Sequence, residues 1–186
     1  MGRYHGKMFA MKNYLIDRFP EINKIQDSDL REKVISTFTK AMKLGGWETM
    51  DGIPFTLLIP NLDVDLAQHT QGVTRIAMKT AQEVAQHGVT FNMDYLIAGA
   101  LLHDVGKLVE YSKKERNVTV SSIGKLLRHP TIGAWLALEA GLPAEVAHII
   151  YCHSWEGDKL NRTPEAHIVH QSDFAFFEPI RAYLKK

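Results

Sequence analysis

Apolar residues recur at helical spacing in several stretches of this chain, and glycine or proline separates one stretch from the next. In residues 28–44 the apolar positions fall three and four apart, behind Ser28 or Asp29 as a plausible N-cap and ahead of a glycine pair. A second stretch of this kind covers residues 66–87. Such spacing places the apolar side chains on one face, so the pattern predicts two long amphipathic helices.

Shorter helices are expected in the second half of the chain. They cover residues 93–102, from Pro130 to Gly141, from Pro143 to about His153, and residues 166–177 behind Pro164. The first of these is apolar nearly all round, which is typical of a central core helix.

Two segments break the pattern of helices. Residues 51–64, with Pro60 and Asn61, predict an extended loop or short strand, and polar residues 111–124 predict a solvated loop.

Composition restricts the class of protein. A chain of 186 residues fits one domain, or one domain with an appendage. Its net charge of +1 argues against a dedicated nucleic-acid surface. Cys152 is the one cysteine, so it forms no intrachain disulfide, which suits a reducing cytoplasm. No apolar stretch is long enough to span a bilayer, and the first residues lack a signal peptide's apolar region. We therefore expect a cytoplasmic protein that does not associate with membranes.

His103 and Asp104 are adjacent polar side chains at the end of the apolar run of residues 97–102. Burying an imidazole and a carboxylate there is costly unless a partner satisfies them. A metal ion would do so, but for this pair alone ordinary hydrogen bonds are the simpler interpretation. Further candidate ligands lie on both sides of the pair in the chain, namely His69, His129, His153 and Asp173.

The order of these residues resembles the HD-domain superfamily of metal-dependent phosphohydrolases. The resemblance covers about residues 60–178, and it includes Gly106 and Lys107 after the dipeptide and a His-Pro pair at His129. It implies an all-α bundle of about seven to nine helices. In this interpretation residues 1–60 are an N-terminal helical extension that packs on the core, and residues 61–186 are the HD metal-binding domain.

The resemblance also implies a ligand set for two divalent transition metals. One metal would be held by His69, His103, Asp104 and Asp173, and Asp104 would bridge to a second metal held by His129 and His153. Relatives without the two middle histidines tend to bind one metal, and this chain has both. Nitrogen and carboxylate ligands suit iron or manganese, with zinc, nickel and cobalt as alternatives. His148 is an alternative ligand to His153, but the residues around Cys152 and His153 resemble the family motif.

Other residues are candidates for contact with a substrate. Lys107 lies three residues after Asp104, and in relatives with the same motif this lysine contacts phosphate or metal-bound solvent, although a surface lysine is the alternative. Arg128 and Lys159 are candidate phosphate ligands, and Trp155 could stack on a base. Tyr151 is a second candidate for stacking, and Arg75 lies off the expected ligand face of its helix.

The resemblance implies a phosphohydrolase, either a phosphomonoesterase or a phosphodiesterase. Its substrate would be a phosphate ester or anhydride of a nucleotide or another small phosphorylated metabolite, attacked by a hydroxide that bridges the metals at Asp104. One alternative is a di-iron HD-type oxygenase that cleaves a C–C or C–P bond. A second is a non-catalytic module that senses nucleotides. Cyclic di-GMP is a poor candidate, because the Gly-Tyr-Pro element of the relevant relatives is absent. A homodimer remains open.

Overall fold

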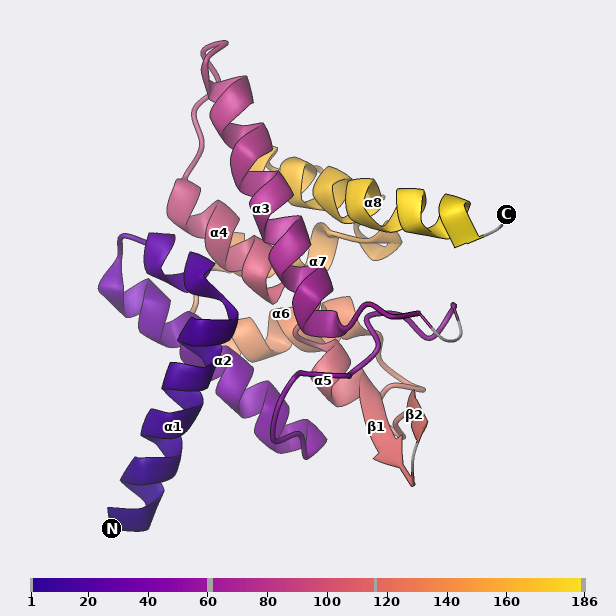
Figure 1. Cartoon of the computed structure of the whole chain (residues 1–186). Coiled ribbons are helices and arrows are strands. Elements are labelled where there is room, and N and C mark those ends of the chain that lie inside the picture. The colour runs from indigo at the N-terminus through magenta and orange to yellow at the C-terminus, as the bar shows by residue number, and fades with distance from the viewer. Residues whose placement is uncertain (1, 60–61, 116, 185–186) are drawn as a thin grey trace.

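A computed structural model describes residues 2–59, 62–115 and 117–184, with side chains from residue 9 onward (Figure 1). Its helices are α1 (Gly2–Arg18), the 3₁₀-helix η1 (Pro20–Lys24), α2 (Ser28–Gly45), α3 (Leu66–Ala85), α4 (Met93–Leu102), α5 (Lys107–Glu110), α6 (His129–Glu139), α7 (Ala144–Cys152), the 3₁₀-helix η2 (Trp155–Gly157) and α8 (Pro164–Leu184). Within the described ranges the strands are β1 (Tyr111–Lys114) and β2 (Asn117–Val120), which form one antiparallel hairpin. The prediction of an all-α fold is confirmed.

Helix α4 is the centre of the bundle. Its residues 96–102 are all buried, as the nearly uniform apolar sequence predicts. Helices α2, α3, α7 and α8 all pack against it, and Figure 1 shows α3 and α4 running side by side. Because α4 ends at Leu102, the next two residues, His103 and Asp104, emerge in the interior of the molecule rather than at its surface.

Residues of the N-terminal third belong to the same hydrophobic core as the rest of the chain. Leu15, Phe19 and Phe38 are fully buried, and the rings of Phe19 and Phe38 stack with their centroids 5.2 Å apart. The indole of Trp47 donates a hydrogen bond to the carbonyl oxygen of Leu108, 2.7 Å away. One hydrophobic core thus includes residues on both sides of residue 60. The predicted boundary between an extension and a domain at this residue stays a prediction.

Two predicted helices differ in detail from the structure. The N-cap of α2 is Asp27 rather than Ser28 or Asp29, because the Asp27 carboxylate accepts hydrogen bonds from the backbone amides of Asp29 and Leu30. The helix ends as expected at the glycine pair, with Gly46 in the left-handed conformation at φ 73°. Helix α8 runs beyond the expected end at residue 177, through Pro179.

The prediction of a solvated loop over residues 111–124 was wrong for its first part. These residues form the β1–β2 hairpin, in which Tyr111 lies opposite Val120. A run of β-branched residues at 118–120 favours a strand, and this signal is hidden among charged neighbours. Residues 51–59 and 62–64 have no helix, as predicted. Pro60, Asn61 and Arg116 lie outside the described residues. None of the described helices is both long and apolar enough to cross a membrane.

Candidate metal centre

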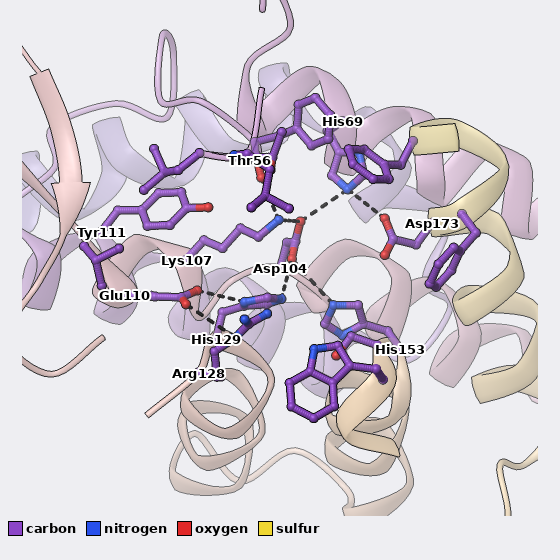
Figure 2. A pocket seen from close by; sticks show the side chains of 18 residues that line it. Thr56, His69, Asp104, Lys107, Glu110, Tyr111, Arg128, His129, His153 and Asp173 are labelled. Carbon is purple, nitrogen blue, oxygen red and sulfur yellow. Dashed lines mark hydrogen bonds and ion pairs between the residues drawn. The ribbon is translucent and has the colours of Figure 1, made fainter. Parts of the chain in front are cut away.

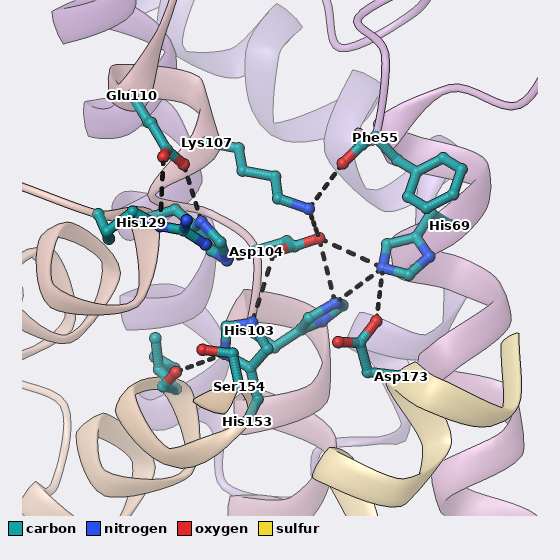
Figure 3. A network of polar contacts seen from close by, with 12 residues as sticks. Phe55, His69, His103, Asp104, Lys107, Glu110, His129, His153, Ser154 and Asp173 are labelled. Atoms are coloured by element: carbon teal, nitrogen blue, oxygen red, sulfur yellow. Dashed lines mark hydrogen bonds and ion pairs between the residues drawn. The ribbon is translucent and has the colours of Figure 1, made fainter. Parts of the chain in front are cut away.

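Six imidazole and carboxylate side chains converge beside the C-terminal end of α4 (Figure 3). They come from separate elements: His69 from α3, His103 and Asp104 from the turn after α4, His129 from the first turn of α6, His153 from the end of α7 and Asp173 from α8. All are buried except Asp173, whose side chain is 21% exposed. The residues that the resemblance implied as ligands are therefore brought together in space.

The first group of atoms surrounds Nε2 of His69. This nitrogen lies 3.1 Å from Nε2 of His103. It lies 3.2 Å from Oδ2 of Asp104 and 3.1 Å from Oδ1 of Asp173. Ligand atoms about 2.1 Å from a common ion, with right angles between them, stand roughly 3 Å apart. The spacing of these atoms therefore fits a single bound cation.

The second group surrounds the other oxygen of Asp104. Oδ1 lies 3.3 Å from Nε2 of His129 and 3.6 Å from Nε2 of His153. It is buried and has no hydrogen-bond partner among the described residues. A buried carboxylate oxygen without a partner is costly, and imidazole nitrogens such as the two that face it are common ligands of divalent cations. Asp104 thus presents one oxygen to each group.

In three of the histidines, Nδ1, the ring nitrogen that points away from Asp104, makes a hydrogen bond that fixes the ring. Nδ1 of His103 donates to the carbonyl oxygen of Ala100 over 2.7 Å, and Nδ1 of His153 donates to that of Ile150 over 2.6 Å. Nδ1 of His129 lies 2.8 Å from the carboxylate of Glu110. With Nδ1 protonated, Nε2 keeps the lone pair that a metal requires.

His69 is held differently from the other three histidines. Its ring stacks on Phe55 with centroids 4.6 Å apart, and its Nδ1 has no hydrogen-bond partner among the described residues. Ring packing on Phe55, together with the contacts of Nε2 with Asp104 and Asp173, therefore fixes the orientation of His69.

The end of α7 is fastened so that His153, and not His148, faces Asp104. Nδ1 of His170 donates to the carbonyl oxygen of His153 over 2.7 Å. The guanidinium of Arg162 donates to the carbonyl oxygen of Cys152 over 2.7 Å. His148 instead lies with Nδ1 3.5 Å from Sγ of Cys152. The buried thiol is thus a neighbour of the site rather than part of it.

Lys107 supplies a buried positive charge beside the central carboxylate. Its ammonium group donates to Oδ2 of Asp104 over 2.7 Å and to the carbonyl oxygen of Phe55 over 2.6 Å. Burial alone would raise the pKa of Asp104, but Lys107 and His103 outweigh burial and hold that pKa well below its usual range. Burial lowers the pKa of Lys107, yet the Asp104 carboxylate outweighs it and leaves this pKa raised. Both groups stay charged near neutral pH.

His69 and His129 differ in proton affinity. Burial lowers the pKa of His69, but hydrogen bonds to Asp104 and Asp173 outweigh burial and leave the pKa above its ordinary value. Burial lowers the pKa of His129 to about 4, against the hydrogen bond to Glu110. His129 is therefore a neutral imidazole at neutral pH, which is the form that binds metals.

Apart from His103, the candidate ligands line a pocket of about 320 Å³ together with Lys107 and Glu110 (Figure 2). Apolar side chains form much of its wall, among them Phe55, Leu58, Val120, Phe174 and Phe177. Arg128 and Trp155 also line it, 51% and 63% exposed, with the guanidinium 5.9 Å from the centre of the indole ring.

Three of the residues considered from the sequence lie elsewhere. Lys159 is exposed and is not among the described residues that line the pocket. The same holds for Tyr151, which is half-buried. Arg75 is exposed and forms an ion pair with Glu21.

Two contributors to the site were missed by sequence reasoning. Glu110 contacts His129, and the backbone of Phe55 accepts from Lys107. The sequence gives a weak indication that Glu110 faces the site, because Glu110 follows Lys107 at the same spacing of three residues at which Lys107 follows Asp104. The sequence gives no indication for the carbonyl group of Phe55, since every residue carries a backbone carbonyl.

Residues 66–173 match the HD domain family, a range that runs from the start of α3 to Asp173. The dihydroneopterin 2',3'-cyclic phosphate phosphodiesterase of Methanocaldococcus jannaschii is 35% identical over 162 residues, which are 82% of this chain and 64% of the relative. The 3'-5' exoribonuclease YhaM of Listeria innocua is 32% identical over 108 residues, 52% of this chain and 34% of the relative.

This chain thus spans less than two thirds of the length of either relative. No solved structure matches it. The family match covers more than half of the chain and includes the six converging histidine and aspartate residues, which form a candidate site for divalent metal ions. The chain belongs to the HD domain family.

Proposed function

We propose that this protein is a metal-dependent phosphodiesterase that opens a cyclic phosphate ester of a small metabolite. The observation that carries the proposal is the central position of Asp104, whose two oxygens face two separate groups of histidine and aspartate atoms. The buried ammonium group of Lys107 lies in the same pocket, so the site combines candidate metal ligands with a cation for a phosphate.

The proposed ligands divide between two divalent ions, with iron or manganese expected first and zinc, nickel or cobalt as alternatives. His69, His103, Asp104 and Asp173 would hold one ion, and Asp104, His129 and His153 the other. Two such ions would supply an activated water for attack on phosphorus and would offset the negative charge that develops on the phosphate.

The cations of the pocket suit an anionic substrate. Lys107 already has two acceptors, so it would orient a phosphate oxygen beside Asp104 by sharing its third proton. Nε of Arg128 faces Glu110 and Glu156, at 3.7 and 3.3 Å, and the two terminal nitrogens, Nη1 and Nη2, complete the guanidinium group. Those nitrogens form the planar fork that binds phosphate oxygens.

The size and wall of the pocket support a small substrate with a planar ring. A volume of about 320 Å³ is at the lower end of the range for small-molecule sites. The exposed indole of Trp155, at the mouth of the pocket, offers a face for stacking. The name of the Methanocaldococcus relative, which specifies a pterin cyclic phosphate, is consistent with such a substrate.

We also propose that residues 1–60 are an extension that completes the pocket of the domain formed by residues 61–186. Phe55 supports this role, because its ring stacks on His69 and its carbonyl oxygen accepts from Lys107. Thr56, Leu57 and Leu58 line the pocket from the same segment.

The test compares wild type with Asp104→Asn after removal of all metal and reloading with Mn²⁺ or Fe²⁺ under anaerobic conditions. The substrates are dihydroneopterin 2',3'-cyclic phosphate and 2',3'-cyclic AMP, and product is separated by chromatography. Wild type should bind about two equivalents of metal and release a phosphomonoester. Asp104→Asn should lose metal and lower the rate by at least roughly a hundredfold.

Three results would overturn the proposal. Wild type that binds no metal would remove its basis. Metal-loaded protein that cleaves neither ester would favour the nucleotide-sensing module. Oxygen consumption by the iron form, without release of a phosphomonoester, would favour the oxygenase.

A further inference from the structure

We propose that Glu110 is a positioning residue that sets the metal affinity of one half of the centre. Its carboxylate fixes the ring of His129 so that Nε2 faces Asp104, and it thereby strengthens the ligand group of Asp104, His129 and His153 without strengthening the other group. This inference rests on the proposed function, because it requires that both groups bind metal.

The turn after α4 and the short helix α5 deliver three charged side chains to one side. Asp104, Lys107 and Glu110 follow one another at intervals of three residues, and all three are buried. Lys107 contacts Asp104, and Glu110, which is 7% exposed, reaches His129 at 2.8 Å (Figure 3). The short segment that carries Asp104 therefore also carries Glu110, whose carboxylate contacts His129, a neighbour of Asp104 in the site.

The hydrogen bond determines which ring nitrogen of His129 carries the proton. An ionised carboxylate only accepts, so Nδ1 must donate to Glu110 and Nε2 must keep its lone pair. Nε2 is the atom that lies 3.3 Å from the unpartnered oxygen of Asp104. Without Glu110 the ring could carry its proton on either nitrogen, and only one of these forms presents a lone pair to the metal.

The four histidines differ in what holds them. His103 and His153 donate to backbone carbonyl oxygens of their own helices, and ring stacking on Phe55 holds His69. Among the described residues His129 is the one of these four histidines whose Nδ1, the nitrogen turned away from the ligand group, contacts a charged side chain. A carboxylate partner also makes the imidazole a stronger electron donor than a carbonyl partner does. Its loss should therefore affect one ligand group selectively.

A purely structural role for Glu110, as counterion of Arg128, fits the geometry less well. Nε of Arg128 lies 3.7 Å from Glu110, whereas Nδ1 of His129 lies 2.8 Å from it. Arg128 also has a second carboxylate, that of Glu156, at 3.3 Å. Glu156 is thus a matched control, because it pairs with the same arginine from a mostly buried position, and its hydrogen bond is to Ser154 rather than to a proposed metal ligand.

The experiment titrates metal-free protein with Mn²⁺ and follows the free ion by electron paramagnetic resonance. Wild type should show two binding constants. Glu110→Ala should weaken one of them by about 10- to 100-fold and leave the other unchanged. Glu110→Gln keeps an oxygen that accepts from Nδ1, so it should recover most of the loss. Glu156→Gln should bind both ions as wild type does.

The outcomes separate this inference from the proposed function. If wild type binds two ions and Glu110→Ala binds both with unchanged affinity, Glu110 has no positioning role. Equal weakening of both sites would also overturn the inference, because it would indicate a general structural defect. Wild type without metal binding would overturn the proposed function instead. Circular dichroism checks the fold. If Glu110→Ala does not fold, Glu110→Asp, whose carboxylate is shorter by one methylene, must show the same selective loss.

Discussion

Lys107 joins the loop that carries Phe55 to the aspartate at the middle of the site. Replacing Lys107 by Met keeps the length of the side chain but leaves the buried carboxylate of Asp104 without its ammonium partner and the carbonyl of Phe55 without a donor. Removing one member of a buried ion pair costs about 3–5 kcal/mol. We therefore expect urea unfolding of metal-free Lys107→Met to give a free energy of unfolding lower by about that amount.

The effect of metal distinguishes this explanation from a simple packing defect. A divalent cation beside Asp104 would replace the positive charge of the missing lysine. Saturating Mn²⁺ should therefore reduce the difference in free energy of unfolding between variant and wild type. The control is Lys79→Met, which replaces an exposed lysine on α3 and should change the free energy of unfolding by less than about 0.5 kcal/mol. A Lys107→Met protein as stable as wild type without metal would contradict the buried ion pair.

At the scale of elements, the close crossing of α5 and α6 positions the histidine at the start of α6 opposite Asp104. A Cβ atom added at Gly106 would lie 2.0 Å from the carbonyl oxygen of His129 and 2.8 Å from the amide nitrogen of Gly133. Both are backbone atoms, so the helices would have to separate. We expect Gly106→Ala to lower the free energy of unfolding by about 1–3 kcal/mol or more. It should also weaken metal binding at the His129 group in the Mn²⁺ titration.

Gly88→Ala is the matched control for this substitution. Gly88 has φ 87°, so alanine is strained there, but the added Cβ would meet no atom within 4 Å. This variant should lose about 1 kcal/mol of stability and keep both metal affinities. If Gly106→Ala bound metal as tightly as Gly88→Ala, the crossing would not be what places His129.

Secondary-structure elements could be predicted from the sequence where a clear local pattern determines them. They were missed where charged neighbours hide that pattern. The apolar run of α4 and the glycines after α2 determine those elements locally. The β1–β2 hairpin was missed because charged residues hide its β-branched run. The candidate ligands come from separate elements, so spacing alone could not bring them together, and only the family resemblance did so. Glu110 was not among the residues that carry that resemblance, and its role depends on a crossing of α5 and α6 that no local pattern encodes.

At the scale of the whole molecule, the elements that carry the candidate metal centre share one hydrophobic core with the N-terminal segment. Trp47 donates to the carbonyl oxygen of Leu108 in α5, next to Lys107, and thus connects the predicted extension to the candidate metal centre. Unfolding of either part should therefore expose the other. The chain has three tryptophans, so Trp135→Phe combined with Trp155→Phe leaves Trp47 as a single fluorescent probe of the extension.

In this variant we expect Trp47 fluorescence and far-ultraviolet circular dichroism to report one coincident unfolding transition. A ligand at a hundred times its dissociation constant stabilises the folded state by about 2.7 kcal/mol for each site. Saturating Mn²⁺ should therefore raise both midpoints together, and a chelator should reverse the shift. If metal moved the dichroism midpoint and left the Trp47 midpoint unchanged, residues 1–60 would unfold independently. The contacts of Phe55 and Trp47 with α3 and α5 would then contribute little to the stability of the site.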